Sequence, residues 1–309
     1  MEKHMESVYD RDFGIYEERI KQRALEAFAD DINGGDITTK AVFGIREKHT
    51  AGAVIVAEED CTLAGILEAR AILEDGGLKV SGKRDGEDVK RGDVVLTVEG
   101  PLHEILARER VVLNYIIQMS GIATISRRLF RRHGRRVLFL RKTNPGLLLS
   151  EKRAVRLGGC LPHRINLSDG ILIKDNHIEE LAKESGREMA IKTAIMRADR
   201  YRRETLWRRN KKLLPIEIEA DSLEDAVVAA KELSKLRGPN IIMLDNMTPE
   251  YVRKAVRKIR EIGGNIIIEA SGGITEETID DYLRAGADCV STSLFISAKS
   301  CRFRLDIIR

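Results

Sequence analysis

The sequence predicts an α/β protein in which an N-terminal α+β domain precedes a parallel α/β barrel. Two observations favour the barrel: from residue 137 onward, short apolar segments alternate with helical ones, and polar side chains follow each apolar segment. Short apolar strands are typical of parallel sheets, because both faces of such sheets are covered. At least six such strands within about 165 residues favour a closed or nearly closed barrel. A doubly wound sheet is the second choice.

The first 110 residues mix helical and strand patterns around turns rich in Asp and Gly. Glycine pairs end two of the helical segments, and Gly100-Pro101 closes the module before a longer helix. The expected helices are 15–30, 67–75 and 103–119, and the expected strands are 51–57, 78–80 and 94–98.

In the second half, strands and helices alternate regularly. The expected strands are 137–140, 171–173, 216–218, 241–244, 266–268 and 289–291. The expected helices are 151–157, 178–209 with a break near Gly186, 222–236, 249–262 and 276–284. Pro249 suits the first position of its helix, where a missing N–H donor costs nothing.

Composition excludes several classes of protein. The chain has 309 residues, enough for about two domains, and its 43% hydrophobic and 33% charged residues exclude a disordered or fibrous chain. The net charge of +4 does not by itself indicate nucleic acid binding. No apolar run approaches the roughly 20 residues of a membrane-spanning helix, and no secretory signal is visible. Neither a nucleic acid nor a membrane is therefore an expected partner.

The four cysteines are widely spaced and form no CxxC pair, so a zinc site or a disulfide framework is not expected. A reduced, cytoplasmic protein is the expectation. These residues are Cys61, Cys160, Cys289 and Cys301.

Charged or hydroxyl side chains follow all six barrel strands, where the active sites of barrels lie. Two lysines and an arginine suit phosphate or carboxylate groups, and two carboxylates suit Mg²⁺ held partly through water. A Ser-Gly-Gly turn after the fifth strand suits a phosphate, because bare backbone donors lie just before a helix. These candidates are Arg141, Lys142, Lys174, Glu219, Asp245 and Ser271–Gly273.

Two other interpretations remain open for the cationic residues. Lys142 or Lys174 suits a Schiff base, as in barrel aldolases. Two arginine-rich runs, 127–136 and 197–212, suit nucleic acid, although a solvated helix face is the favoured interpretation because few aromatic residues interleave.

The motifs together resemble the quinolinate phosphoribosyltransferase family, also called nicotinate-nucleotide pyrophosphorylase (carboxylating). The resemblance covers nearly the whole chain. The matching segments are 36–39, Glu109-Arg110, Leu113-Asn114, 120–124, 141–146, 154–159, His163-Arg164, 172–177, 217–219, 244–246 and 269–273.

The resemblance implies a type II phosphoribosyltransferase fold, in which a sandwich-like α+β domain precedes an incomplete parallel α/β barrel. The implied domains are 1–112 and 113–297, with residues 298–309 packing back on the first. It also implies a homodimer in which Arg110 completes the site of the partner subunit, with a hexamer as a further alternative.

The resemblance implies transfer of a phosphoribosyl group from phosphoribosyl pyrophosphate to quinolinate, with pyrophosphate and CO₂ released, as in NAD biosynthesis. Lys142, Lys174, Glu219 and Asp245 match the catalytic residues, and the two carboxylates match the ligands of Mg²⁺. The residues that match quinolinate-binding positions are Arg110, Arg141, Lys142, His163, Arg164 and Lys174. Those that match phosphoribosyl pyrophosphate-binding positions are Glu109, Lys142, Lys174, Glu219, Asp245, Ser271, Gly272, Gly273 and Ser293.

Three positions depart from the family pattern. Ser293 stands where the family usually has Gly, Ser297 where it commonly has His, and Leu148 where it has Arg. If a helix begins after the last strand, both serine hydroxyls are expected to reach one anion. Two alternatives stay open: a paralogue with another phosphoribosyl acceptor, similar to the one linked to molybdenum use, and a non-catalytic regulatory paralogue.

Overall fold

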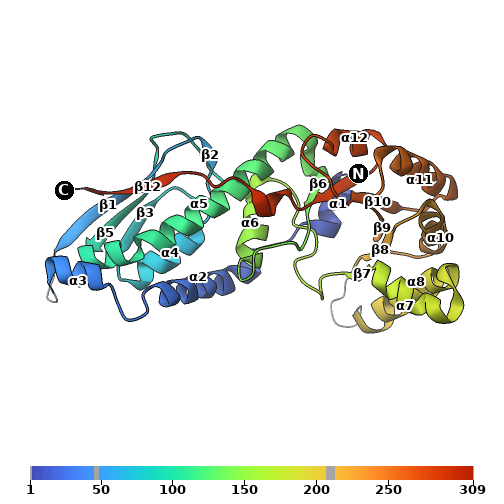
Figure 1. The fold of residues 1–309 in the computed structure, drawn as a ribbon, viewed down its shortest axis with the longest axis horizontal. Coiled ribbons are helices and arrows are strands. Elements are labelled where there is room, and N and C mark those ends of the chain that lie inside the picture. Colours follow the sequence, from blue (N-terminus) through green and yellow to red (C-terminus); the bar gives the residue numbers. More distant parts are fainter. Residues whose placement is uncertain (1, 45–48, 207–212, 309) are drawn as a thin grey trace. The chain divides into compact units, whose positions relative to one another are not determined.

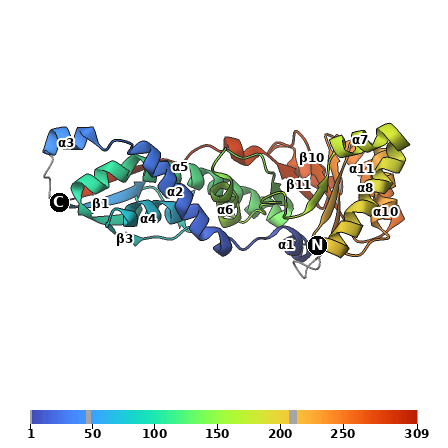
Figure 2. The same cartoon turned by 90° about the horizontal axis from the view of Figure 1, so that it is seen from below.

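The computed structural model describes residues 2–44, 49–206 and 213–308, and the chain forms two compact units (Figures 1 and 2). We call them the barrel unit and the sandwich unit. The barrel unit contains the residues up to Asp10, 133–142 and 161–294. The sandwich unit contains residues 11–132, 143–160 and those from Phe295 onward.

The barrel unit is built on six parallel strands in the order β6-β11-β10-β9-β8-β7. Strands β7 to β11 lie beside their neighbours in sequence, whereas a doubly wound sheet reverses direction near its middle. The edge strands β6 and β7 do not pair within the described residues, so the predicted incomplete α/β barrel is confirmed. The strands are β6 (Val137–Phe139), β7 (Ile171–Ile173), β8 (Ile216–Ala220), β9 (Asn240–Asp245), β10 (Ile266–Ser271) and β11 (Cys289–Thr292).

The helices of the barrel unit follow their strands and pack on one another in sequence order (Figure 2). The predicted break near Gly186 is confirmed, since α7 ends at Ser185 and α8 begins at Arg187. Residues 207–212, part of the second arginine-rich run, lie outside the described residues. The helices are α7 (Asp175–Ser185), α8 (Arg187–Tyr201) with a π-helical turn (Arg202–Leu206), α10 (Leu223–Leu233), α11 (Pro249–Ile262) and α12 (Ile279–Arg284).

A helix that the sequence did not predict, α1 (Glu2–Tyr9), belongs to the barrel unit. Its Met5, Val8 and Tyr9 are buried in one cluster with side chains of the barrel strands, among them Leu138 and Ile267. The three residues follow the i, i+3, i+4 spacing of one helix face. Helix α1 therefore contributes to the core of the barrel.

The sandwich unit has a four-stranded antiparallel sheet in the order β12-β1-β5-β3, covered by helices (Figure 1). The C-terminal strand β12 pairs with β1. The strands are β1 (Thr50–Ala57), β3 (Lys79–Gly82), β5 (Val94–Pro101) and β12 (Phe303–Ile308), with a separate pair β2 (Cys61–Thr62) and β4 (Asp88–Val89). The helices are α2 (Glu17–Asp31), α3 (Ile37–Phe43), α4 (Ile66–Asp75), α5 (Leu102–His133) and α6 (Leu148–Gly158).

The units differ from the predicted domain boundary at residue 112. Helix α5 continues to His133, well beyond the predicted end near residue 119, and its buried Leu113 and Ile116 pack in the core of the sandwich unit. Gly121 does not end this helix. A Cβ atom at Gly121 would clash with the carbonyl oxygen of Lys299, so this glycine permits a close approach of two backbone segments.

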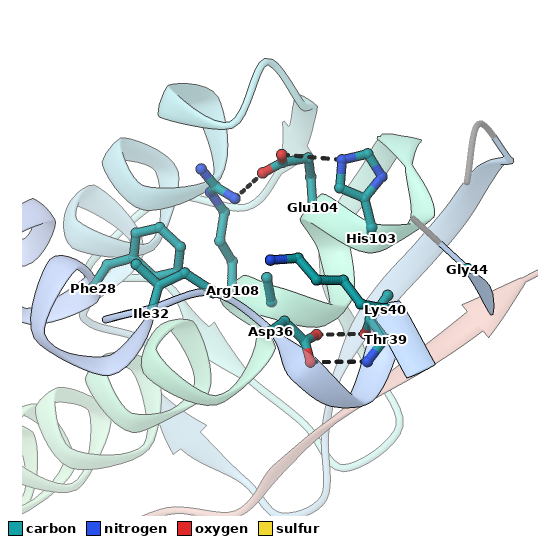
Figure 3. Close-up of a pocket in the computed structure, with 11 residues that line it drawn as sticks. Phe28, Ile32, Asp36, Thr39, Lys40, Gly44, His103, Glu104 and Arg108 are labelled. Carbon is teal, nitrogen blue, oxygen red and sulfur yellow. Dashed lines mark hydrogen bonds and ion pairs between the residues drawn. The ribbon is translucent and has the colours of Figure 1, made fainter. Parts of the chain in front are cut away.

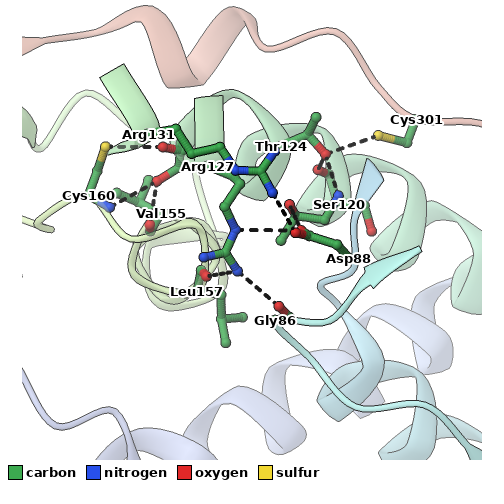
Figure 4. A network of polar contacts seen from close by, with 12 residues as sticks. Gly86, Asp88, Ser120, Thr124, Arg127, Arg131, Val155, Leu157, Cys160 and Cys301 are labelled. Atoms are coloured by element: carbon green, nitrogen blue, oxygen red, sulfur yellow. Dashed lines mark hydrogen bonds and ion pairs between the residues drawn. The ribbon is translucent and has the colours of Figure 1, made fainter. Parts of the chain in front are cut away.

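Arginines of the first basic run make contacts within the sandwich unit (Figure 4). Arg127 Nη2 donates to the carbonyl oxygens of Gly86 (2.9 Å) and Leu157 (3.2 Å), and Arg131 pairs with Asp88. Guanidinium groups engaged in this way are held by the protein itself, which agrees with a structural role for this run.

None of the described helices combines the length and the apolar character that crossing a membrane requires.

Candidate active site

A cavity of about 370 Å³ opens in the barrel unit and brings together most of the predicted site residues. Its polar lining comes from the ends of β8, β9 and β10, from the segments that follow β6 and β7, and from the loop before β7. Carboxyl ends of parallel strands are where α/β barrels place their active sites. The lining residues are Leu140, Arg141, Lys142, His163, Arg164, Leu172, Lys174, Glu219, Met243, Asp245 and Ser271.

Lys174 and Glu219 form an ion pair across two neighbouring strands. Lys174 Nζ lies 3.0 Å from Glu219 Oε1, and the backbone N–H of Asp175 donates to Glu219 Oε2 at 3.3 Å. The lysine side chain is half exposed and the carboxylate largely buried. A Schiff-base lysine must be a neutral, desolvated amine, so an exposed and ion-paired Lys174 does not suit that role.

Asp245 ends β9 and lies beside β10. Burial and the nearby Glu219 carboxylate raise the pKa of Asp245, and a hydrogen bond from Ser271 opposes them. Asn246 next to it adopts a left-handed backbone with φ of +54° and donates to Asp245 Oδ2 at 2.6 Å. Two neighbouring carboxylates that repel each other are a site for a divalent cation or for donors on a ligand.

Arg164 is a buried cation without full compensation. Its Nη1 donates to the carbonyl oxygen of Gly170 at 3.2 Å, while its buried Nε has no hydrogen-bond partner among the described residues. A buried guanidinium donor left unpaired is costly, and an anion in the cavity that Arg164 lines would satisfy it.

His163 lies in a buried cluster with two carboxylates. Its Nε2 is 3.3 Å from Glu217 Oε1 and 3.5 Å from Glu269 Oε1, and its Nδ1 accepts the backbone N–H of Arg164 at 2.7 Å. Burial opposes the charged imidazolium, but the two carboxylates outweigh burial and raise the pKa of His163. The backbone N–H of Arg164 opposes this rise in pKa, because it occupies the Nδ1 lone pair to which a second ring proton must bind.

Backbone strain is concentrated beside this cavity. Among the described residues other than glycine, only His163 (φ +53°) and Asn246 (φ +54°) have positive φ. Such conformations cost of order 1–3 kcal/mol and cluster at functional sites.

The turn after β10 differs from its predicted form. Gly272 and Gly273 adopt φ of +88° and +61°, but α12 begins only at Ile279, so the turn does not lead directly into a helix. The predicted helix start at residue 276 is therefore wrong. The side chain of Thr292 on β11 donates to the carbonyl oxygen of Ile274 at 3.0 Å, which fixes the turn against the sheet.

Ser293 follows β11 and is half-buried, and it is not among the residues that line the cavity. The next residues, Leu294–Ser297, form a single 3₁₀ turn. The condition for both serine hydroxyls to reach one anion, a helix after the last strand, is therefore met only by this short turn and by no α-helix of the described residues.

Glu109 and Arg110 lie on α5 in the sandwich unit, half-buried and exposed respectively. The neighbouring Arg108 is buried: its guanidinium lies 4.4 Å from the Phe28 ring centre and donates to the carbonyl oxygen of Ile72. Because residues two apart point in different directions on a helix, Arg108 is structural whereas Arg110 faces outward.

Arg108 also lines a second cavity of about 410 Å³ in the sandwich unit, bordered by α2, α3 and α5 (Figure 3). Asp36 caps α3 by accepting the backbone N–H of Thr39, and Glu104 pairs with Arg108. Segment 36–39, one of those that match the family motifs, thus has a structural role at the start of α3.

Sequence reasoning missed Tyr9. The Tyr9 hydroxyl donates to Glu269 Oε2 at 3.0 Å, and its ring stacks on His163 with ring centres 4.9 Å apart. The apolar spacing of Met5, Val8 and Tyr9 is the signal that predicts this helix, but it covers barely two turns.

Comparison with known families agrees with this geometry. A family model described as quinolinate phosphoribosyl transferase, C-terminal domain, matches residues 122–306, and the N-terminal domain model of the same family matches residues 36–120. The chain belongs to the quinolinate phosphoribosyltransferase family. The resemblance drawn from the motifs is confirmed.

Individual members of the quinolinate phosphoribosyltransferase family match over most of their length. The chain is 36% identical over 278 residues to a probable nicotinate-nucleotide pyrophosphorylase (carboxylating) of Methanothermobacter thermautotrophicus, covering 87% of this chain and 91% of the relative. It is 33% identical over 299 residues to a protein of the same description from Bacillus subtilis, covering 94% and 93%. A solved nicotinate-nucleotide pyrophosphorylase from Francisella tularensis matches with a TM-score of 0.78 and 26% identity over 94% of this chain and 97% of that one.

Proposed function

We propose that this chain transfers the phosphoribosyl group of phosphoribosyl pyrophosphate to quinolinate, giving nicotinate mononucleotide, pyrophosphate and CO₂. The observation that carries the proposal is one cavity lined by four cationic side chains and two carboxylates at the ends of the barrel strands. The pyridine nitrogen attacks C1 of the ribose while the C1–oxygen bond to pyrophosphate breaks. The C–C bond to the 2-carboxylate then breaks, CO₂ leaves, and a proton replaces it on the ring.

Quinolinate is a dianion, and the cations of the cavity suit it. Arg164 supplies a buried donor without a partner, and Arg141 and Lys142 line the same cavity. Arg-to-carboxylate hydrogen bonds are strong and directional, so these groups fix the ring in one orientation. Holding two anionic substrates together against their repulsion is the main catalytic task, because the reaction needs no covalent intermediate with the protein.

Glu219 and Asp245 suit the Mg²⁺ that accompanies phosphoribosyl pyrophosphate. Both carboxylates line the cavity, and burial together with the nearby Glu219 carboxylate raises the pKa of Asp245. When bound, Mg²⁺ neutralises the negative charge that develops on the leaving pyrophosphate. Lys174 and Lys142 supply cations beside them, and the backbone of Gly272 and Gly273 supplies donors for the 5′-phosphate.

The proposed enzyme is a homodimer in which Arg110 serves the partner's cavity. Arg110 is exposed on α5, whereas the neighbouring Arg108 is buried and makes contacts within its own unit. An exposed arginine two residues from a buried one is available to a second subunit. We also propose a cytoplasmic location, supported by four cysteines that are all buried thiols outside any disulfide.

The decisive experiment measures mononucleotide and CO₂ formed from phosphoribosyl pyrophosphate and Mg²⁺ with either quinolinate or nicotinate. Quinolinate should be used far better, because several cations around one small cavity favour a dicarboxylate. Lys142→Ala is the matched inactive control. Equal turnover of the two acceptors would contradict the proposal, and turnover of neither would indicate a paralogue with another acceptor or a binding role.

A further inference from the structure

We propose that Tyr9 is a positioning residue for the substrate cavity, acting through Glu269 and His163 on Arg164. Its expected effect on KM rests on the proposed function, whereas its expected effect on His163 does not. Helix α1 then belongs to the catalytic apparatus rather than being only a cover for the barrel core.

Tyr9 contacts the histidine cluster in two ways. Its ring stacks on His163 at an interplanar angle of 29°, and its hydroxyl donates to Glu269 Oε2. Tyr9 is almost fully buried, and burial together with Glu217 and Glu269 raises its pKa, so the hydroxyl keeps its proton. Tyr9 is therefore a permanent donor to Glu269.

His163 links this cluster to the substrate cavity. Its Nδ1 accepts the N–H of Arg164, which leaves the Nε2 proton for a carboxylate. Both His163 and Arg164 line the cavity. The orientation of the imidazole therefore fixes the backbone at the arginine that has an unpaired donor.

The same three side chains, His163, Glu217 and Glu269, have the composition of a metal site. Their geometry argues for a hydrogen-bond network instead. A metal bound at Nε2 requires a lone pair there, but Nδ1 already uses the ring's lone pair to accept the Arg164 N–H. Nε2 therefore carries the proton and donates it to a carboxylate.

Two carboxylates compete for that single Nε2 proton. Glu217 Oε1 lies nearer at 3.3 Å, while Glu269 Oε1 at 3.5 Å has no hydrogen-bond partner among the described residues. Tyr9 satisfies the other oxygen of Glu269, and the weak donor Cys289 Sγ lies 4.0 Å from it. Without the Tyr9 hydroxyl, Glu269 lacks its strong donor and draws a second proton onto His163.

A second proton on His163 has a defined consequence. It must go to Nδ1, where it displaces the N–H of Arg164. Four elements supply the residues that face this imidazole: α1, β8, β10 and the loop before β7. The displacement of the Arg164 N–H is therefore confined to one cluster. The groups concerned are Tyr9, Glu217, Glu269 and Arg164, with Cys289 of β11 behind Glu269.

The family models do not include this helix. They begin at residue 36, so Tyr9 lies outside both matched ranges. The role of Tyr9 is thus read from this chain's own contacts.

The test combines kinetics with a spectroscopic measurement that does not depend on activity. Tyr9→Phe keeps the ring stack and removes the hydroxyl. We expect it to raise KM for quinolinate about tenfold with little change in KM for phosphoribosyl pyrophosphate, the size of one lost hydrogen bond to a charged group. In ¹⁵N spectra of histidine-labelled protein recorded over a pH series, with His163 assigned by its loss in His163→Gln, the change from the Nε2–H tautomer to imidazolium should occur at a higher pH than in the wild type.

Two controls separate positioning from stability. Tyr282→Phe removes a hydroxyl from another buried ring of the barrel unit, and Met5→Ala removes buried apolar surface of α1 while it keeps the Tyr9 hydroxyl. Both should leave KM and the His163 signals unchanged. A Tyr9→Phe protein that has only a lower Tm, with unchanged KM and an unchanged His163 spectrum, would overturn the proposal. If no acceptor is used by the wild type, the proposed function fails, and the spectrum alone decides this inference.

Discussion

Lys174 Nζ lies 3.0 Å from Glu219 Oε1, so the ends of two adjacent barrel strands carry a lysine and a carboxylate in direct contact. The pair lines the cavity, and in the proposed function the lysine keeps the carboxylate in place until phosphoribosyl pyrophosphate and Mg²⁺ bind. Because the lysine is half exposed, the pair adds little to stability.

Lys174→Met should therefore lower kcat/KM by about 10–100-fold with almost no change in Tm, the size of a lost charged hydrogen bond. Glu219→Gln should have a similar effect, and the double variant should lose less than the two single effects combined, because the residues are coupled. Lys183→Met, which breaks the exposed ion pair with Glu180 on α7, is the matched control and should change neither kcat/KM nor Tm. Strictly additive losses would contradict direct coupling.

Asp245→Asn should stabilise the fold at pH 7 while it weakens phosphoribosyl pyrophosphate binding tenfold or more. Burial and Glu219 raise the pKa of Asp245, so the folded state binds the proton more tightly than the unfolded state. The contribution of such a carboxyl to stability falls as pH rises through the window between the two pKa values, and at pH 7 the charge is a cost. Thermal unfolding should show a higher Tm for the variant at pH 7 and a smaller difference at low pH.

The raised pKa of Asp245 also predicts how affinity depends on pH. As the pH falls, the wild type should lose affinity for phosphoribosyl pyrophosphate with Mg²⁺ at a higher pH than it would if Asp245 had an ordinary pKa. Glu179→Gln on the outside of α7 should alter neither stability nor affinity. A lower Tm for Asp245→Asn at pH 7 would show that the carboxylate is compensated in the free enzyme.

Gly272→Ala and Gly273→Ala form a matched pair. Both residues have positive φ, so each alanine costs about 1–2 kcal/mol of backbone strain. At Gly272 the new Cβ would also lie 2.6 Å from the backbone nitrogen of Asn246, whereas at Gly273 no atom lies within 4 Å. Gly272→Ala should thus destabilise the protein by about 1–3 kcal/mol more than its neighbour, because it adds overpacking. Equal unfolding free energies would contradict this reading of the turn.

Arg110→Ala and Lys142→Ala should complement each other. Each variant alone is expected to be inactive, but a hybrid dimer contains one cavity with both residues intact. Random exchange of equal amounts gives half hybrids, each with one of its two cavities intact, so about 25% of wild-type activity should return. Absence of recovery, with subunit exchange demonstrated by mass, would contradict a shared cavity.

The barrel was predictable because the sequence pattern of each of its strands is local. Each buried parallel strand is a short apolar run, and the polar residue that follows it reaches the cavity by geometry alone. Lys174, Glu219 and Asp245 could therefore be assigned to the cavity from the sequence alone. Their clustering in one cavity follows from the strand order.

Non-local contacts explain what the sequence did not predict. The sequence predicts a helix end near residue 119, but α5 continues to His133, and the backbone near Lys299 packs against its Gly121. Helix α1 has too few residues for its spacing to be distinctive, and only the buried partners of Tyr9 reveal its task. Helix α12 starts only at Ile279, after a turn that a hydrogen bond from the distant Thr292 holds against the sheet.

The chain belongs alternately to its two units, in six successive segments. A single recombination breakpoint anywhere between Arg11 and Leu294 therefore leaves parts of both units on each side. Neither unit can be exchanged between genes as one block of coding sequence. During evolution the two must be inherited together, and a new acceptor specificity has to arise by point substitution around the cavity rather than by domain shuffling.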